Sequence, residues 1–176
     1  MVFSTIMRIT LHSIETQVAR CRRCPLYKTS HKGVPGEGNP HARIFFVGQA
    51  PGRNEDKSGR PFVGMTGKFL DKQLERIGID RADVFITSVV KHFPPDNRMP
   101  TKDESAACLP YLLEQIEQVD PAIVVLMGNL AQSIKNQPVL HGRRIVSLPH
   151  PAAAMRFPKL RKTFEAKLTT IIHSMK

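Results

Sequence analysis

IFFVGQAPGRNEDKSGRPFVGMTG, the stretch from Ile44 to Gly67, decides the fold of this chain. Its first residues, Ile44–Val47, are all apolar and rich in β-branched and aromatic types, which predicts a short buried strand. A loop punctuated by glycine and proline follows from Gly48 to Gly64, and a helical pattern begins near Thr66. Open α/β sheets place their sites beyond the carboxyl ends of strands. A loop of this length without its own secondary structure is uncommon unless it is functional or disordered.

The loop carries side chains suited to binding and chemistry. They are an amide, two arginines, a carboxylate pair and a single aromatic ring, namely Gln49, Arg53, Arg60, Glu55, Asp56 and Phe62. The ring of Phe62 offers a face on which a planar base can stack, a contact worth about 1–3 kcal/mol. Glu55 or Asp56 can orient a water or stabilise a cationic sugar-like transition state. The alternative is that Phe62 fills the core and that both carboxylates are simply solvated.

Strand and helix patterns alternate along the rest of the chain. Further strands are predicted at Val84–Val90, Ala122–Met127 and Ile145–Leu148, and helices at Ser13–Arg20, from Thr66 to Gly78, from Thr101 to before Pro121, at about Asn129–Ile134 and from near Lys159. Such alternation predicts a parallel sheet between helices. The carboxyl ends of parallel strands share one edge, so the loops at Gln49, Lys91 and His150 should converge there.

Length and charge narrow the class of protein. A chain of 176 residues fits a single domain over residues 1–176, and no stretch is long enough to cross a bilayer. Met1–Thr10 has no sustained apolar region, which predicts neither a signal peptide nor an anchor and makes the cytoplasm the expected compartment. The formal net charge of +11 favours a polyanionic partner, nucleic acid being the commonest.

The three cysteines predict a metal centre. An odd number without an export signal argues against a disulfide framework. Cys21 and Cys24 form a C-R-R-C pair that can grip one metal from a single turn, Cys108 can add a third thiolate, and His92 is the candidate fourth ligand. A Cys₃His set indicates zinc, with an iron–sulfur cluster as the other option. Three unrelated buried cysteines remain the plain alternative.

His150 is held between two prolines directly after the last predicted strand. A rigid donor at that place can stabilise negative charge that develops on a leaving group. The segment A-A-A-M-R-F-P follows, in which Met155 can enter a base stack as a wedge while Arg156 meets a phosphate. The same segment is equally consistent with the start of the last helix.

An ordered series of motifs completes the pattern: C-R-R-C, G-E-G-N-P, F-V-G-Q-A-P-G-R-N-E-D, G-R-P-F-V-G, V-V-K-H-F-P-P-D-N-R-M-P-T, A-A-C-L-P-Y-L and H-P-A. In this order the series resembles the iron–sulfur uracil-DNA glycosylases of family 4, from about Cys21 to the C-terminal helix. The resemblance implies a three-layer α/β/α sandwich around a four-stranded parallel sheet. It also implies DNA base-excision repair, a flipped-out base and a structural 4Fe–4S cluster.

The resemblance also implies roles for particular residues. Gln49 and Ala50 would grip the base by their backbone, Phe62 would stack on it, His150 would face its carbonyl and Glu55 would handle water. The cluster ligands would be Cys21, Cys24, His92 and Cys108, with zinc as the alternative metal.

Three positions depart from the usual family pattern. Gln49 stands where a glutamate is usual, Ser88 stands where an asparagine precedes V-V-K, and His92 stands where cysteine is more frequent. A carboxamide can donate to one uracil atom and accept from the next, whereas a serine hydroxyl cannot do both from one plane. The K-H-F string resembles a branch that becomes covalently trapped on uracil. That branch carries an R-R-I-H loop which this chain lacks, so turnover is expected instead.

The resulting hypothesis is a monofunctional DNA glycosylase that hydrolyses the N-glycosidic bond of a deaminated base, uracil foremost. The base would stack on Phe62, contact the Gln49–Ala50 backbone and be read at its edge by Ser88. The expected partner is single- or double-stranded DNA containing uracil, with no membrane, and the expected state is a monomer. One alternative is a pocket retuned to another base such as hypoxanthine. The other is a DNA-binding module with little catalysis.

Overall fold

Residues 9–172 are described by a computed structural model of the chain, so the N-terminal stretch expected to be neither leader nor anchor lies almost entirely outside the described residues. The elements in chain order are α1 (Leu11–Ala19), η1 (Pro25–Lys28), β1 (Glu37–Gly38), β2 (Ile44–Gly48), α2 (Arg53–Ser58), α3 (Met65–Arg76), η2 (Arg81–Asp83), β3 (Phe85–Ser88), η3 (Pro95–Asn97), α4 (Lys102–Val119), β4 (Ile123–Met127), α5 (Asn129–Gln132), η4 (Pro138–Leu140), β5 (Arg144–Leu148), α6 (Pro151–Arg156) and α7 (Pro158–Ile172). The η elements are single 3₁₀ turns.

The central sheet has the strand order β1-β3-β2-β4-β5. The four strands β2 to β5 are parallel, with Phe46 opposite Ile86 on β3 and Val125 on β4, which confirms the predicted parallel sheet. The two-residue strand β1 adds an antiparallel edge beside β3, where the sequence predicted a loop. A pairing of two residues is too short to leave a period-two pattern in the sequence.

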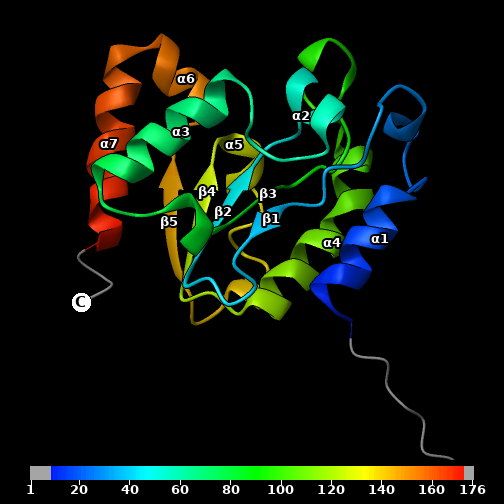
Figure 1. Ribbon diagram of the computed structural model, residues 1–176, viewed down its shortest axis with the longest axis horizontal. Helices are drawn as coiled ribbons and strands as arrows, with labels where there is room; N and C mark the ends of the chain where they lie inside the picture. Colours follow the sequence, from blue (N-terminus) through cyan, green and yellow to red (C-terminus); the bar gives the residue numbers. More distant parts are fainter. Residues whose placement is uncertain (1–8, 173–176) are drawn as a thin grey trace, which may run out of the picture.

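Helices cover both faces of the sheet, which gives three layers (Figure 1). Alternate residues of β2 face opposite ways, because successive side chains of a strand point to opposite faces. Ile44 and Phe46 pack in one core with α3, α6 and α7, whereas Phe45 and Val47 pack in a second core with α4. The expected three-layer sandwich is therefore confirmed. Helix α1 lies outside α4, where Ile14 and Val18 form a small third cluster with Cys21 and Tyr111.

The sequence predicted no secondary structure in the long loop after β2. The structure instead has the six-residue helix α2 inside this loop. The backbone N–H of Gly52 donates to Oε2 of Glu55 at 3.1 Å, a contact that caps this helix. A helix of that length has no apolar periodicity to detect. The predicted start of a helix at Thr101 is confirmed by a capping box on α4, in which Thr101 N donates to Glu104 Oε2 at 2.8 Å.

The carboxyl ends of β2, β3 and β5 lie at the same edge of the sheet, at the top of Figure 1. The loops that follow them all leave from this edge, as expected. Within residues 9–172, no helix is long and apolar enough to cross a membrane.

Candidate active site

A cavity of about 350 Å³ lies at this edge of the sheet. Its lining includes six of the residues that the sequence singled out, namely Gln49, Ala50, Glu55, Phe62, Ser88 and His150. The loop after β3 also lines the cavity, through Pro94, Asn97, Arg98, Met99 and Pro100. Gln49 and His150, which are 101 positions apart in the sequence, thus line the same cavity.

Phe62 and His150 face each other in this cavity. Their ring centroids are 6.5 Å apart and the ring planes are inclined by 34°. The Phe62 ring lies against the main chain of β2, since a Cβ added to Gly48 would come within 2.5 Å of Cζ of Phe62. A Cβ on Gly67 would likewise overlap the carbonyl oxygen of Phe62. Both glycines are therefore needed for Phe62 to occupy this position.

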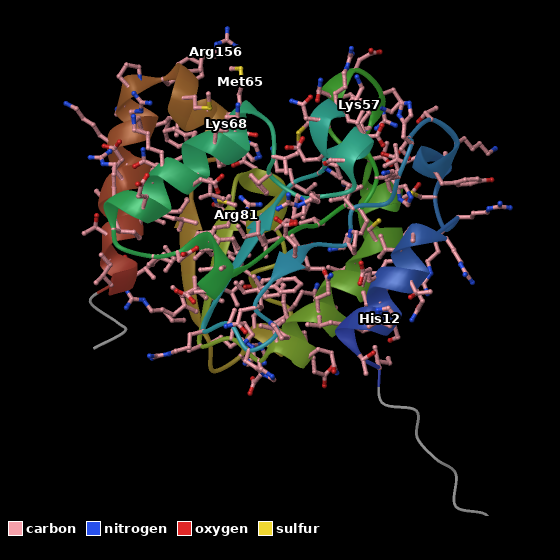
Figure 2. The ribbon with its side chains drawn as sticks, viewed as in Figure 1. His12, Lys57, Met65, Lys68, Arg81 and Arg156 are labelled. Atoms are coloured by element: carbon pink, nitrogen blue, oxygen red, sulfur yellow. The ribbon has the colours of Figure 1, made fainter. Side chains whose placement is uncertain are left out.

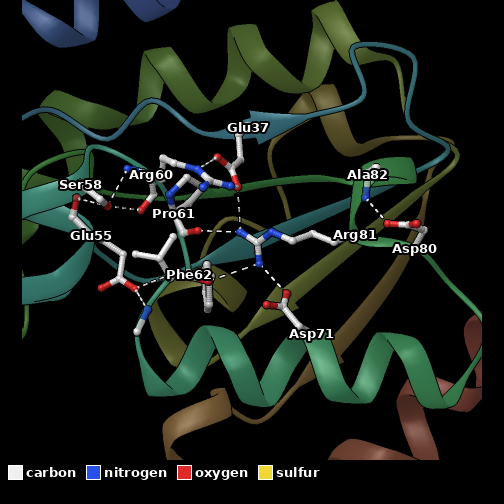
Figure 3. A network of polar contacts seen from close by, with 12 residues as sticks. Glu37, Glu55, Ser58, Arg60, Pro61, Phe62, Asp71, Asp80, Arg81 and Ala82 are labelled. Atoms are coloured by element: carbon white, nitrogen blue, oxygen red, sulfur yellow. Dashed lines mark hydrogen bonds and ion pairs between the residues drawn. The ribbon is translucent and has the colours of Figure 1, made fainter.

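Phe62 itself has a left-handed backbone, with φ of +50°. For a bulky residue this conformation costs about 1–2 kcal/mol, so neighbouring groups must stabilise it. Arg81 donates to the carbonyl oxygens of Pro61 and Phe62 at 2.7 and 3.3 Å. On the other side, both Val63 N and Gly64 N donate to Glu55 (Figure 3). Phe62, the residue expected to stack on a base, thus has a strained backbone that is held by contacts on both sides.

Glu55 is buried and lines the cavity. Its Oε1 accepts from Val63 N and Gly64 N, both at 2.8 Å, and its Oε2 accepts from Gly52 N at 3.1 Å. A carboxylate has about four acceptor positions, so one position on Oε2 is left for a further donor. Glu55 is therefore above all the residue that holds the loop in shape.

Asp56, the other member of the carboxylate pair, points away from the cavity. Its Oδ2 lies 2.6 Å from Nδ1 of His31, and its Oδ1 accepts from His31 N at 2.8 Å. These contacts tie α2 to the segment after η1 rather than to the candidate site. Of the two carboxylates, only Glu55 lines the space where a substrate would bind.

His150 is the N-cap of α6, where Nδ1 accepts from Ala152 N at 3.2 Å. An imidazole that accepts at Nδ1 carries its proton at Nε2, so the cap determines the tautomer. Burial lowers the pKa of His150 to about 4. Near neutral pH the ring is therefore uncharged and has a single N–H, at Nε2.

Ser88 lines the cavity. The side chain of Lys91, which follows it in the sequence, is completely buried. Its ammonium donates to Thr87 Oγ1 at 2.6 Å, to Ser88 O at 2.8 Å and to Gln115 Oε1 at 2.6 Å. Burial lowers the pKa of Lys91 to about 7, whereas three acceptors at such distances favour the charged form. The loop after β3 reaches the site as expected. Lys91 itself does not line the cavity but holds the main chain at Ser88.

The loop after β3 contributes residues that sequence reasoning missed. Arg98 donates to both carboxylate oxygens of Glu104, at 2.8 and 2.7 Å, and so fixes the loop to α4. This pairing with Arg98 lowers the pKa of Glu104 to about 2. The prolines of this loop restrict its backbone, but no spacing rule indicated that Asn97 and Met99 would line a cavity.

The two residues expected to meet DNA differ in their surroundings. Met155 is half-buried and packs against the core under α6, whereas Arg156 is exposed. The more exposed methionines at this edge are Met65, with 72% of its surface exposed, and Met99, with 56%. Figure 2 shows both Met65 and Arg156 at the upper edge of the molecule. Neither exposed methionine had a recognisable sequence signal.

The candidate metal ligands lie in a different part of the molecule, between α1, η1 and α4. Cys21, Cys24 and Cys108 are all buried free thiols. Burial raises the pKa of Cys108 to about 11. A cavity of about 440 Å³ is lined by Cys21 and His92.

His92 is 5% exposed, and its Nδ1 is a buried polar atom with no hydrogen-bond partner. Leaving such an atom unpaired is costly, and metal coordination would satisfy it. In residues 9–172, however, no three His, Cys, Asp or Glu side chains are already arranged to hold a metal ion. The three thiols and the unpaired Nδ1 of His92 are donor atoms that fit a metal centre. The four side chains are not, however, arranged as a complete set of ligands around one point.

Comparison with known proteins places these features in a family. Residues 35–172 match the family model of the uracil DNA glycosylase superfamily. A type-4 uracil-DNA glycosylase of Saccharolobus solfataricus is 42% identical, with 88% of this chain and 82% of that protein aligned. One of Thermotoga maritima is 41% identical over 81% of this chain and 82% of that protein.

More distant relatives match less of the chain. A type-5 uracil-DNA glycosylase of Pyrobaculum aerophilum is 35% identical, over 69% of this chain and 60% of that protein. A crystal structure of the UNG protein from Nitratifractor salsuginis aligns with 73% of this chain and 73% of its own, at 16% identity and a TM-score of 0.38. On the strength of the family model and of the relatives aligned along most of their length, this chain belongs to the uracil DNA glycosylase superfamily.

Proposed function

We propose that the protein is a monofunctional uracil-DNA glycosylase, which hydrolyses the bond between a flipped-out uracil and its deoxyribose during base-excision repair. The observation that carries the proposal is the cavity in which Phe62 and His150 face each other, with ring centroids 6.5 Å apart. Extruding a base costs a few kcal/mol, and this is least for a mismatched or single-stranded base. The similarity to type-4 uracil-DNA glycosylases supports uracil in DNA as the substrate.

Recognition of the base is assigned to the cavity wall. The Phe62 ring stacks on one face of the base, a contact worth about 1–3 kcal/mol. The backbone of Gln49 and Ala50 contacts the base from the end of β2, and the Ser88 hydroxyl reads its edge from the end of β3. One hydroxyl cannot satisfy two neighbouring edge atoms at once, which is why other deaminated bases belong in the same test.

Catalysis is assigned first to His150. Loss of uracil leaves negative charge on its carbonyl oxygen, and the Nε2–H of a neutral imidazole can donate to that oxygen. Because the Ala152 N–H occupies Nδ1, the ring needs no rearrangement before it donates. A preorganised donor of this kind is typically worth about 10²–10³ in rate.

Glu55 is assigned two tasks. It keeps Val63 N and Gly64 N in place, which positions the Phe62 loop. Its remaining acceptor position on Oε2 holds the water that attacks the sugar. The two tasks use different oxygen positions, so one carboxylate can perform both.

DNA is assigned to the edge of the sheet at which the cavity opens. The exposed Arg156 contacts a phosphate there, and the net charge of +11 favours approach of a polyanion. Met155 is half-buried beside it, so only part of its side chain is available to a base stack. We also infer that residues 1–176 form one domain that works as a monomer on DNA in the cytoplasm.

A structural 4Fe–4S cluster is assigned to Cys21, Cys24, Cys108 and His92, with zinc as the alternative. The assignment rests on the resemblance to family 4, on three buried thiols and on the orphaned Nδ1 of His92. When bound, the metal centre would cross-link the segment around η1 to α4 and to the loop after β3. The residues themselves contribute soft sulfur ligands and one imidazole nitrogen.

Release of the free base tests the proposal directly. The purified protein is incubated with oligonucleotides that contain one uracil, hypoxanthine or thymine, single-stranded or paired, and the liberated base is measured by mass spectrometry and the abasic site by alkaline cleavage. We expect uracil release and alkali-labile sites without strand cleavage before alkali. A His150→Asn preparation made identically controls for a contaminating host enzyme.

Two other outcomes would replace the proposal. Faster release of hypoxanthine than of uracil would identify a retuned glycosylase. Salt-sensitive DNA binding without release of any base would identify a DNA-binding module, whose affinity falls with the number of phosphates neutralised.

A further inference from the structure

Arg81 lies behind the loop that carries Phe62, although no sequence pattern singles it out. It comes from η2, between α3 and β3, and 23% of its side chain is exposed. Its Nη2 donates to the carbonyl oxygen of Pro61 at 2.7 Å and its Nη1 donates to that of Phe62 at 3.3 Å. One guanidinium therefore contacts two successive carbonyls at the base-stacking residue.

Two carboxylates orient that guanidinium from opposite sides (Figure 3). Asp71 on α3 accepts from Nη1 at 2.6 Å, and Glu37 on β1 accepts from Nη2 at 3.0 Å. Burial raises the pKa of Glu37, but hydrogen bonds from Arg60 and Arg81 outweigh this effect and lower it. Glu37 is therefore charged near neutral pH, and the planar fork of Arg81 is held in one orientation.

Glu55 completes the arrangement from the other side of the loop. It accepts from Val63 N and Gly64 N, both at 2.8 Å, directly after the carbonyls that Arg81 contacts. The main chain from Pro61 to Gly64 is thus held between a cation on its carbonyl side and an anion on its N–H side. Between these contacts lies the left-handed φ of +50° at Phe62.

We propose that Arg81 is a positioning residue for base recognition, which keeps the Phe62 ring on the cavity wall by holding the carbonyls of Pro61 and Phe62. The inference rests on the proposed glycosylase function and deepens it. Arg81 does not line the cavity, so its effect on a bound base would be exerted through the Phe62 loop. Without its fork the loop relaxes toward negative φ, and the ring leaves the place where a base would stack.

A positioning role and a purely structural role predict different results. If Arg81 acts through the Phe62 ring, its loss weakens binding of an extruded base but leaves contacts to the DNA backbone intact. If it only stabilises the fold, the folded variant binds every DNA probe as the parent does. Two probes separate these effects: duplex DNA with 2′-fluoro-2′-deoxyuridine, which resists cleavage, and the same duplex with a tetrahydrofuran abasic analogue.

The experiment compares the parent with Arg81→Ala and Arg81→Lys by titration at one salt concentration, after thermal melting has established that each is folded. We expect Arg81→Ala to lose about tenfold in affinity for the uracil probe, the lower part of the range for one base stack. Its affinity for the abasic probe should stay within about twofold of the parent. Arg81→Lys keeps the charge but not the fork, so it should lose most of the same increment.

Arg76→Ala is the matched control. Arg76 also pairs with a carboxylate, its Nη1 lying 2.7 Å from Glu165, but 56% of its side chain is exposed and it does not contact the Phe62 loop. It should bind both probes as the parent does. In a Phe62→Ala background, Arg81→Ala should add no further loss for the uracil probe, because the ring it positions is already absent.

Three results would overturn the inference. The first is equal affinity for the uracil probe in the parent and in the folded Arg81 variants, and the second is an equal loss of affinity for both probes. The third is a loss of affinity that adds to that of Phe62→Ala in the double variant. If Arg81→Ala does not fold, Arg81→Lys and Asp71→Asn decide the question by the same ratio of affinities. The proposed function fails separately. In that case the parent itself does not release uracil and does not prefer the uracil probe to a thymine duplex.

Discussion

Replacing His150 separates two roles that the structure gives to one side chain. Its Nδ1 caps α6 by accepting from Ala152 N at 3.2 Å, and its Nε2–H is the proposed donor to the departing base. Asparagine is a good N-cap but its side chain is too short to reach the base from this position. His150→Asn therefore keeps the cap and loses the donor, whereas His150→Ala loses both.

The expected magnitudes follow from these contacts. Loss of a preorganised donor costs about 10²–10³ in rate, which is about 2.7–4 kcal/mol in the barrier, for both variants. Loss of the cap costs about 0.5–2 kcal/mol in the free energy of unfolding, for the alanine variant only. Single-turnover release of uracil measures the first quantity, and urea unfolding measures the second. A His150→Asn variant that cleaves at the parental rate would refute the assignment of the donor.

The pH dependence provides a second check on the same residue. Burial lowers the pKa of His150 from 6.5 to about 4, so folding disfavours the charged imidazole. The corresponding contribution to stability is complete above pH 6.5 and is lost as the pH falls through about 4. As the pH falls between these two values, we expect His150→Asn to lose less stability than the parent. We also expect the parent's cleavage rate to show no ionisation of His150 between about pH 5.5 and 8. A rate that requires a protonated imidazole near pH 6.5 would contradict the neutral donor.

Gly48→Ala places a methyl group 2.5 Å from Cζ of Phe62, so kcat/KM for uracil DNA should fall by about tenfold or more as the ring is displaced; an unchanged kcat/KM would mean that the ring is not used. Arg98→Ala should lower the free energy of unfolding at pH 7, because the charge-assisted bonds from Arg98 to Glu104 are lost. Since the pKa of Glu104 is lowered from 4.5 to about 2 in the folded protein, the difference between parent and variant should be complete above pH 4.5 and shrink as the pH falls toward 2; a difference independent of pH in urea titrations would count against this pairing. The Cys108→Ser variant should lose iron content, visible absorbance and several degrees in Tm. Zinc in place of iron in the parent protein would establish the alternative metal. A parent protein with neither metal would contradict the metal centre.

The parallel sheet and its functional edge were predictable because their signals are local. Ile44–Val47 and Ala122–Met127 are continuous apolar runs, which is the pattern of strands covered on both faces. Once the strands are parallel, the residues that follow them must share one edge, and this places Gln49, Ser88 and His150 around one cavity. The convergence of the site is thus a consequence of strand direction.

The parts that escaped prediction depend on contacts distant in sequence or on very short elements. Strand β1 has two residues and α2 has six, too few to show a period. The burial of Lys91 depends on acceptors supplied by Thr87 and Gln115, which no local rule can supply. The left-handed backbone of Phe62 is flanked by contacts from Arg81 and Glu55, which lie 19 residues after and 7 residues before it.

The central claim is that one nucleobase lies between Phe62 and His150. The structure of the protein bound to a duplex that contains a single 2′-fluoro-2′-deoxyuridine tests it most directly. We expect the uracil ring outside the helix, stacked on Phe62, with one of its carbonyl oxygens within hydrogen-bonding distance of Nε2 of His150. A uracil that remains paired in the duplex, or that occupies a different part of the protein while this cavity stays empty, would contradict the account.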